Sequence, residues 1–447
     1  MTVKYATAAT AASTTTSVRR ALAFDDNPPL SIPLRFFLSA PLFTMLAGAL
    51  LLWQGEAALL SRWSPLTLAL THLLVLGTLS MVMAGALLQM LPVVAGVAVP
   101  RVALTGGAIH AGLVAGTLFL AAAFWWQRPF LFQLALCALV AALLLFVGAC
   151  TVALWRQGDG VATAVMASVR QALAALAVTL VLGVLLAAAF AWPGVHGLPL
   201  VRLTDLHALW GLGGWVGLLV IGIAFQVVPM FMVTEPYPDW ITRGAASLLF
   251  VLLAAASASS TMAPGATGVL VRQVALALLA CGFAVFGAIT LYLLARRKRP
   301  RADPTTLYWR TAMVCLLAAC TWPLWPLLPL LRVDGMNAAP LMLGVLLLVG
   351  FALSAINGML YKIVPFLVWY GLQGTPKLPN VGKMIPETAA RLQYAAHVAS
   401  LLLLLAACWW PAELAQGAGA LLLAAALGLW INMSTAVRLC RRTAIKE

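Results

Sequence analysis

Four of the five histidines in this 447-residue chain lie inside long apolar stretches. They are His72, His110, His207 and His397. Ionisable side chains are costly within a bilayer and are usually kept there for a function. Imidazole nitrogen binds haem iron and copper, so these positions predict a haem or metal site. For any single histidine the simpler interpretation is a hydrogen-bonded core residue, because no short ligand spacing such as HxxxH or CxxCH occurs.

Two of these histidines occupy matching places in a pattern that occurs three times. The three segments end at Pro92, Pro229 and Pro365. Each segment has a glycine 15 residues and another 7 residues before its proline. His72 and His207 lie 20 and 22 residues before their prolines, and the third segment has Met342 at 23 residues before. A thioether also ligates haem iron or copper, so Met342 is a further candidate ligand.

A long polar residue lies three positions before each proline. These residues are Gln89, Gln226 and Lys362. On a helix they share a stripe with the second glycine and the proline, and their side chains could bond the carbonyl that proline leaves free. Lys362 has two further interpretations, as a proton-path residue or as a side chain that extends to the membrane surface. Asp205 is predicted either to orient a ligand or to pair with Arg202.

The elements that must position these residues are membrane helices. The chain is 63% apolar and 9% charged, whereas soluble domains are about 45–50% apolar and about 25% charged. This composition excludes a soluble globular protein and a disordered one. The apolar runs are unbroken, which excludes the alternating pattern of a membrane β-barrel.

We predict twelve membrane-spanning helices that form one domain over residues 36–437. Their limits are 36–56, 64–94, 102–126, 129–155, 168–193, 203–233, 240–263, 268–296, 306–331, 338–370, 389–410 and 411–437. The repeated pattern falls on 64–94, 203–233 and 338–370, so the chain is predicted to contain three copies of a four-helix unit. Residues 1–35 are expected to form a flexible tail, and 438–447 a short basic tail.

The net charge of +15 does not indicate nucleic-acid binding, because the cations sit in short loops between apolar runs. Twelve spans place 21 of the 27 Lys and Arg residues on the side of the two termini and five on the other. The more positive side faces the cytoplasm. Both termini are therefore predicted to be cytoplasmic, with His72 and His207 in the outer half of the lipid bilayer. The seven cysteines form no CxxC and are interpreted as small hydrophobic residues.

The number of spans, the three four-helix arcs and histidines on the second and sixth helices resemble the haem–copper oxidase subunit I superfamily. The stretch THLLVLGTLSMVMAGALLQMLPVVAG resembles that family's second helix, where a histidine binds low-spin haem. The opening PLRFFLSAPLF followed by this helix is also similar to the NnrS family, haem- and copper-associated relatives linked to nitric oxide stress. The tenth span has no histidine, and His207 is followed by Ala208 where the oxidases have proline.

The resemblance implies a haem- or metal-binding protein of the bacterial inner membrane without the complete oxidase centre. Haem b is the expected cofactor, and copper is the alternative. His72 would be an axial ligand, with His207 or His397 as its partner. Such a protein would serve respiration, nitric oxide stress or cofactor handling, with a membrane or periplasmic redox partner. The alternatives are a transporter for a small solute and a non-catalytic assembly subunit.

Overall fold

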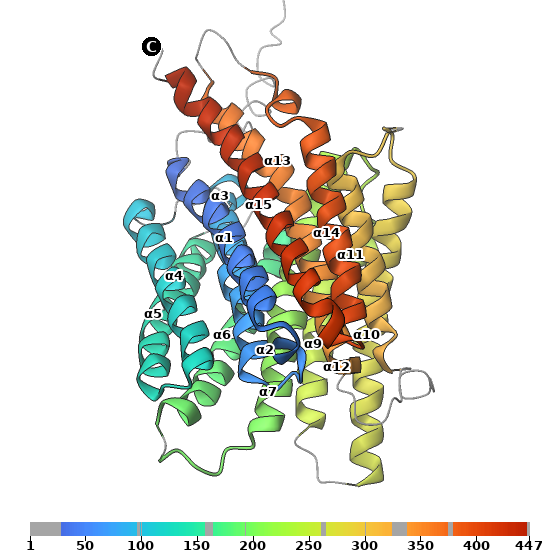
Figure 1. Ribbon diagram of the computed structural model, residues 1–447. Coiled ribbons are helices and arrows are strands. Elements are labelled where there is room, and N and C mark those ends of the chain that lie inside the picture. The colour runs from blue at the N-terminus through green and yellow to red at the C-terminus, as the bar shows by residue number, and fades with distance from the viewer. Residues whose placement is uncertain are drawn as a thin grey trace, which may run out of the picture.

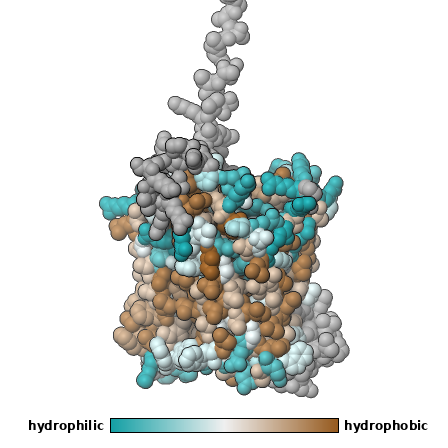
Figure 2. Space-filling view, turned by 45° about the horizontal axis from the view of Figure 1, so that its top comes forward, coloured by the Kyte–Doolittle hydropathy of each residue, from teal (hydrophilic) through white to brown (hydrophobic). Residues whose placement is uncertain are grey.

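The computed structural model describes residues 28–95, 99, 101–156, 164–192, 194–260, 265–299, 301–323, 338–373 and 379–444. It is 88% helical, and its described part contains no strand. Eleven of the described helical stretches are long and apolar enough to cross a bilayer. The prediction of an all-helical, multi-pass membrane protein is therefore confirmed. Figure 2 shows a band of apolar side chains between two hydrophilic fringes, the surface that would contact lipid.

The first third of the chain forms four long helical stretches. These are α1 (Ser31–Gln54), the continuous stretch α2 (Pro65–His72), η4 (Leu73–Ser80) and α3 (Met81–Ala95), then α4 (Val102–Trp126) and α5 (Pro129–Trp155). A short 3-10 helix, η3 (Gly55–Leu59), follows α1. Ser64 caps α2, and proline occupies the first turn of α2 and of α5, where its missing N–H costs nothing.

The second third repeats this order of elements. It consists of α6 (Ala164–Ala191), the stretch α7 (Leu200–Ala208), η5 (Leu209–Leu218) and α8 (Leu219–Met232), then α9 (Asp239–Ser259) and α10 (Ala266–Ala295).

The last third begins with a shorter helix. It consists of α11 (Pro304–Cys320), the stretch α12 (Ala338–Val345), η8 (Leu346–Leu353) and α13 (Ser354–Gly371), the 3-10 helix η9 (Val381–Lys383), then α14 (Glu387–Ala407) and α15 (Pro411–Ala444). The predicted span 306–331 is too long, because α11 ends at Cys320, shortly before Pro323. Residues 324–337 lie outside the described part.

The predicted tails are also shorter than expected. Residues 1–27 lie outside the described part, but α1 already begins at Ser31, inside the predicted tail. At the other end α15 continues to Ala444 through three arginines, which are good helix formers. The basic C-terminal segment is therefore helical up to this residue.

In the described part of the chain, nine outer helices surround three inner stretches. The outer helices follow one another in chain order, α1, α4, α5, α6, α9, α10, α11, α14 and α15, and α15 packs against α1 to close the ring. Figure 1 shows the first and last helices side by side. The inner stretches α2–α3, α7–α8 and α12–α13 are 78%, 72% and 61% buried over their most apolar windows, against at most 56% for the other spans.

Each inner stretch contains a π-helical segment at the same place. Leu73, Leu209 and Leu346 begin these segments, 19, 20 and 19 residues before the prolines at 92, 229 and 365. The segments meet at the centre of the bundle, where η8 contacts both η4 and η5 and the Trp215 indole donates to Ser80. π-Helical turns in α-helices often occur at functional sites, which directs attention to the residues around them.

The repeated glycines pack the inner helices against the outer helix that precedes them. A Cβ atom on any of the six would lie closer than 3.0 Å to a residue of α1, α6 or α11. In chain order the six glycines are Gly77, Gly85, Gly214, Gly222, Gly350 and Gly358, and the residues that they meet are Phe43, Phe36, Ala175, Ser168, Cys315 and Tyr308. In each case the two contacted residues are seven positions apart, which is two helical turns.

Candidate metal centre

His72 and His207 lie next to each other, as one of the two predicted pairings requires. Their ring centres are 6.2 Å apart, and the ring planes are inclined by 27°. His72 is the last residue of α2, and His207 is the penultimate residue of α7, so each ring leaves its helix directly before the π-helical segment. Both residues are half-buried. They lie at the end of the bundle where α2, α7 and α12 begin, which we call the histidine end (Figure 1).

Each ring is anchored through Nδ1 to a backbone carbonyl. His72 Nδ1 is 2.8 Å from the Leu68 carbonyl, and His207 Nδ1 is 3.0 Å from the Thr179 carbonyl of α6. A carbonyl can only accept a hydrogen bond, so Nδ1 carries the proton in both rings. Nε2 of each ring then has the lone pair. Metal-binding histidines are commonly fixed in this way, with the other ring nitrogen donating to a carbonyl.

The spacing of the two rings suits a shared ion. Two nitrogens that bind one metal at about 2.0 Å each stand roughly 4 Å apart, and each ring centre lies about 1 Å further back. Ring centres on the order of 6 Å apart are therefore expected for two imidazoles on opposite sides of one metal. The 6.2 Å between the ring centres of His72 and His207 is compatible with this spacing, which also requires the two Nε2 atoms to face each other.

Aromatic side chains form one wall of the pair. The Phe124 ring of α4 stacks on His72 with 5.4 Å between the ring centres. Phe132 and Phe190 continue the cluster from α5 and α6. On the other ring, Gly183 faces His207 so closely that an added Cβ would be 3.0 Å from the imidazole. These residues could not be predicted from the sequence, since they come from three different outer helices and share no motif.

An ion pair joins the two histidine helices at their exposed ends. Arg62 Nη2 is 2.8 Å from Asp205 Oδ1, with both side chains partly exposed. Asp205 lies two residues before His207, and Arg62 precedes α2. The predicted pair between Asp205 and Arg202 is not found among the described residues; the guanidinium that reaches this carboxylate is that of Arg62, in the segment before α2.

His110 is not part of this pair. Its Nε2 is 2.8 Å from Ser39 Oγ of α1, and its ring packs edge-on against Phe36. It lies 14 residues before Phe124 on α4, which is about 21 Å along the helix. The expectation that His110 shares a metal with His72 is therefore not supported by this arrangement, and His110 has the simpler role of a hydrogen-bonded histidine.

His397 and Met342 also have other surroundings. His397 is 1% exposed, its Nε2 is 2.8 Å from Ser354 Oγ, and its ring packs on Tyr308. Of the two predicted partners of His72, the structure therefore brings His207 to it. Met342 packs against the small apolar cluster of Ala338, Leu341 and Cys408.

The three long polar residues before the prolines have different environments. Gln89 is buried and its Oε1 has no hydrogen-bond partner, whereas Gln226 is exposed. Lys362 Nζ bonds Asp303 Oδ2 at the N-terminus of α11, at 2.5 Å. The long polar residues at equivalent positions of the repeated pattern therefore make different contacts in the three inner helices.

The ligand atoms available around His72 and His207 limit which metal centres fit this site. Among the described residues, no three or more His, Cys, Asp or Glu side chains are grouped closely enough to hold an ion. Two imidazoles suffice for haem iron, which takes four nitrogens from the porphyrin, or for a copper ion with few ligands. A haem would also need a slot of several hundred Å³. The cavity beside His397 is about 10 Å³, and a second, of about 270 Å³, lies between α4 and α5 at Thr105 and Leu144; neither is lined by His72 or His207.

No protein-family model and no curated protein matches this chain.

Proposed function

We propose that this chain is a metal-binding protein of the bacterial inner membrane that holds copper or haem iron between His72 and His207. One observation carries the proposal. Two imidazoles from different helices stand 6.2 Å apart, and each has Nδ1 anchored on a carbonyl. A pair of neutral imidazoles with free Nε2 atoms is a ligand set for a soft or borderline metal.

We further infer a triplicated four-helix architecture of the kind found in haem–copper oxidase subunit I. The common position of the three π-helical segments supports it, as does the identical seven-residue spacing in the glycine contacts. In this arrangement the inner helices supply the metal ligands and the outer ring insulates them. The third inner helix has no histidine, so the centre is smaller than that of an oxidase.

The residues around the pair have separate roles in this proposal. The carbonyls of Leu68 and Thr179 orient the rings, and Phe124 keeps water from one side of His72. The Arg62–Asp205 pair holds the two helix ends together. Bound copper or haem would supply one-electron chemistry. That chemistry suits a task in respiration, nitric oxide stress or cofactor handling, with a redox partner at the histidine end.

Metal content and spectrum of the purified full chain test the proposal. The protein is expressed with iron, copper and haem precursor supplied, and reduced-minus-oxidised spectra are taken with iron and copper analysis. We expect stoichiometric metal, accompanied by a Soret band for haem and by none for copper. His72→Ala and His207→Ala should each lose it, while His110→Ala, a matched intramembrane histidine with its own Ser39 partner, should retain it.

Two results would count against the proposal. One is protein free of iron and copper after this expression, and the other is full metal content in the His72→Ala, His207→Ala double variant. Specific binding of a small solute by metal-free protein would favour a transporter instead.

A further inference from the structure

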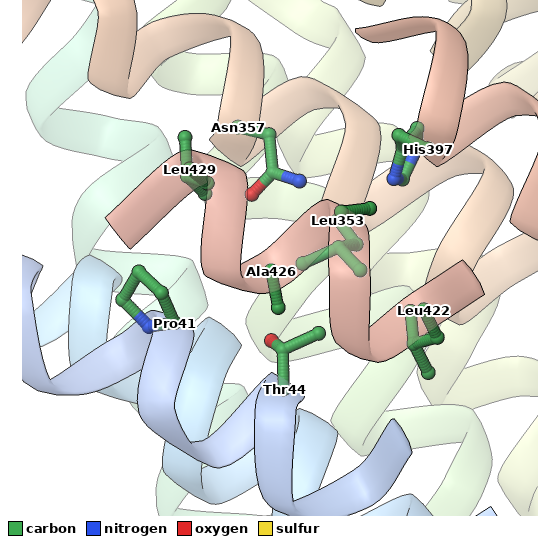
Figure 3. A pocket seen from close by; sticks show the side chains of 9 residues that line it. Pro41, Thr44, Leu353, Asn357, His397, Leu422, Ala426 and Leu429 are labelled. Carbon is green, nitrogen blue, oxygen red and sulfur yellow. The ribbon is translucent and has the colours of Figure 1, made fainter. Parts of the chain in front are cut away.

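A groove lies on the outer surface of the bundle, between α4 and α5. Its volume is about 270 Å³, whereas the cavity beside His397 in Figure 3 has about 10 Å³, close to the space that one water molecule needs. Figure 1 shows α4 and α5 side by side at one edge of the bundle, so the groove faces the surrounding lipid. Mainly apolar residues line it, namely Thr105, Leu144, Leu145, Gly148, Ala149 and Val152.

The groove arises because α4 and α5 pack closely near their middle but not towards one end. A Cβ atom on Gly112 would lie 2.7 Å from the Ala142 Cβ, and one on Gly116 would lie 2.6 Å from the Leu139 side chain. Towards the end of the bundle opposite the histidine pair, an added Cβ on Gly148 of α5 would have no atom within 4 Å. The space between the two helices therefore opens towards the headgroups of one leaflet.

Two arginines lie at this end of the groove. The Arg156 N–H donates to the carbonyl of the lining residue Val152 at 3.2 Å. On α4, the N–H of the lining residue Thr105 donates to the Arg101 carbonyl at 3.0 Å. Both arginines are exposed, and neither forms an ion pair within the described part of the chain. Trp155, which is 82% exposed, precedes Arg156, and tryptophan is typical of the boundary between hydrocarbon and water.

We propose that this groove binds an anionic phospholipid, with one acyl chain between α4 and α5 and the phosphate held by Arg101 and Arg156. From Leu144 to Val152 the groove follows α5 for about 12 Å, and the hydrocarbon of one leaflet is about 15 Å thick. An acyl chain that descends from the headgroup therefore fits along the groove. Guanidinium groups bind phosphate oxygens through paired, charge-assisted hydrogen bonds, so the two arginines are complementary to the headgroup.

A second copy of the chain suits this groove less well than a phospholipid does. Copies in one membrane have the same orientation, so their more basic ends lie at the same level. A copy docked here would bring its own Lys and Arg side chains towards Arg101 and Arg156, and like charges repel. A phospholipid instead brings negative charge at the level of the arginines and apolar surface along the groove.

Native mass spectrometry of the full chain in detergent tests the proposal, because it counts the phospholipids bound to each protein molecule. The probes are phosphatidylglycerol and phosphatidylcholine with identical acyl chains. We expect one phosphatidylglycerol to bind more tightly than phosphatidylcholine by on the order of tenfold, because choline neutralises the phosphate charge. Millimolar inorganic phosphate should not displace it, since free phosphate has no acyl chain.

Two variants test the groove and the charges separately. Gly148→Phe fills the open space and should remove the tight phosphatidylglycerol site. Arg101→Gln with Arg156→Gln removes both charges and should weaken this binding by on the order of thirtyfold. Arg299→Gln with Arg301→Gln is the matched control, because it removes two exposed arginines between α10 and α11 at the same end of the bundle. The control should keep the affinity of the unmodified protein.

Equal affinity for the two phospholipids would overturn the proposal, because it would indicate a general lipid coat. Unchanged phosphatidylglycerol binding in either test variant would also overturn it, and so would an equal loss in the control. A dimer of the unmodified protein that Gly148→Phe dissociates would assign the groove to a second copy. Thermal unfolding identifies a variant that does not fold, and the other test variant then decides. The result is independent of the metal centre proposed above.

Discussion

The two rings of the candidate centre differ from the other buried imidazoles in which nitrogen they use. His72 and His207 bond a backbone carbonyl through Nδ1, whereas His110 and His397 bond a serine through Nε2. A serine hydroxyl can donate or accept, so those two rings are satisfied within the protein. In each of the two rings that bond a carbonyl, Nε2 has an unused lone pair. These two rings are neighbours. This difference separates a candidate ligand from a core histidine.

The ion pair between Asp303 and Lys362 lies at the end of the bundle opposite His72 and His207. It gives a prediction for how the stability of the protein depends on pH. Burial would raise the pKa of Asp303, but the Lys362 ammonium and the hydrogen bonds from Lys362 and Thr306 together lower this pKa below its ordinary value of 3.8. The folded state therefore gains stability from the carboxylate above its unfolded pKa of about 4 and loses that gain as the pH falls through the lower, folded pKa.

We expect Asp303→Asn, which can still cap α11, to lower the unfolding free energy at pH 7 by about 1 kcal/mol, because the pair is partly exposed. The difference from the unmodified protein should shrink below about pH 4, where the aspartate itself becomes protonated. Denaturant unfolding in detergent at several pH values measures both. A difference that stayed constant down to the lowest pH would contradict the assigned ion pair.

At the scale of elements, composition predicted where helices begin and end. It did not predict which face of a helix packs against its neighbours. The predicted spans 102–126 and 129–155 coincide with α4 and α5, because apolar length alone determines where a chain can cross lipid. The aromatic wall at Phe124 and the partner of Asp205 depend on which face each helix turns to its neighbours. Uniformly apolar helices carry little periodic contrast, so the sequence does not specify that face.

The π-helical segments could not be predicted for a related reason. A π-helical turn is wider than an α-helical turn, so the side chains that follow it point to a different side of the helix. A sequence reveals this change of side only where polar and apolar residues alternate. The segment LLLVGFAL of η8 has no polar residue to mark it. The repeated glycines were visible, since glycine is a distinct residue type, and the structure assigns them a common packing role.

The packing of the inner helices against the outer helices predicts that alanine substitution at two glycines changes stability in different directions. A Cβ at Gly222 would overlap Ser168 of α6, so Gly222→Ala should destabilise the protein by about 1–3 kcal/mol. Gly148 of α5 has open space where an added Cβ would lie, so Gly148→Ala should be neutral or stabilise the helix by up to about 1 kcal/mol. Thermal unfolding of both variants measures the contrast. Equal effects would show that α6 and α8 do not approach as described.

At the scale of the whole molecule, the described helices form a closed ring of nine around three inner stretches, and the proposed site depends on this arrangement. The ring is consistent with the order of spans in the sequence, because each outer helix packs on the next one along the chain. The pairing of His72 with His207 follows from this arrangement, since both inner helices start at the same end of the bundle. His397 enters from the opposite end on α14, and this separates it from the pair.

The distribution of charge predicts the orientation of this ring. The basic residues gather at the end opposite the histidine pair, so the histidine end should face outward. A single introduced cysteine, His196→Cys, lies on an exposed loop of the histidine end. In intact cells it should react with a membrane-impermeant maleimide, whereas Lys298→Cys at the other end should react only after lysis. The reverse labelling would place the candidate metal centre on the cytoplasmic side.

X-ray absorption at the metal edge of the purified protein identifies the ligands of a bound ion. We expect iron or copper with two imidazole nitrogens at about 2.0 Å. This imidazole scattering should disappear in the His72→Ala, His207→Ala variant and persist in His110→Ala. A bound metal without imidazole ligands, or the same imidazole scattering in the double variant, would show that His72 and His207 are not the ligands.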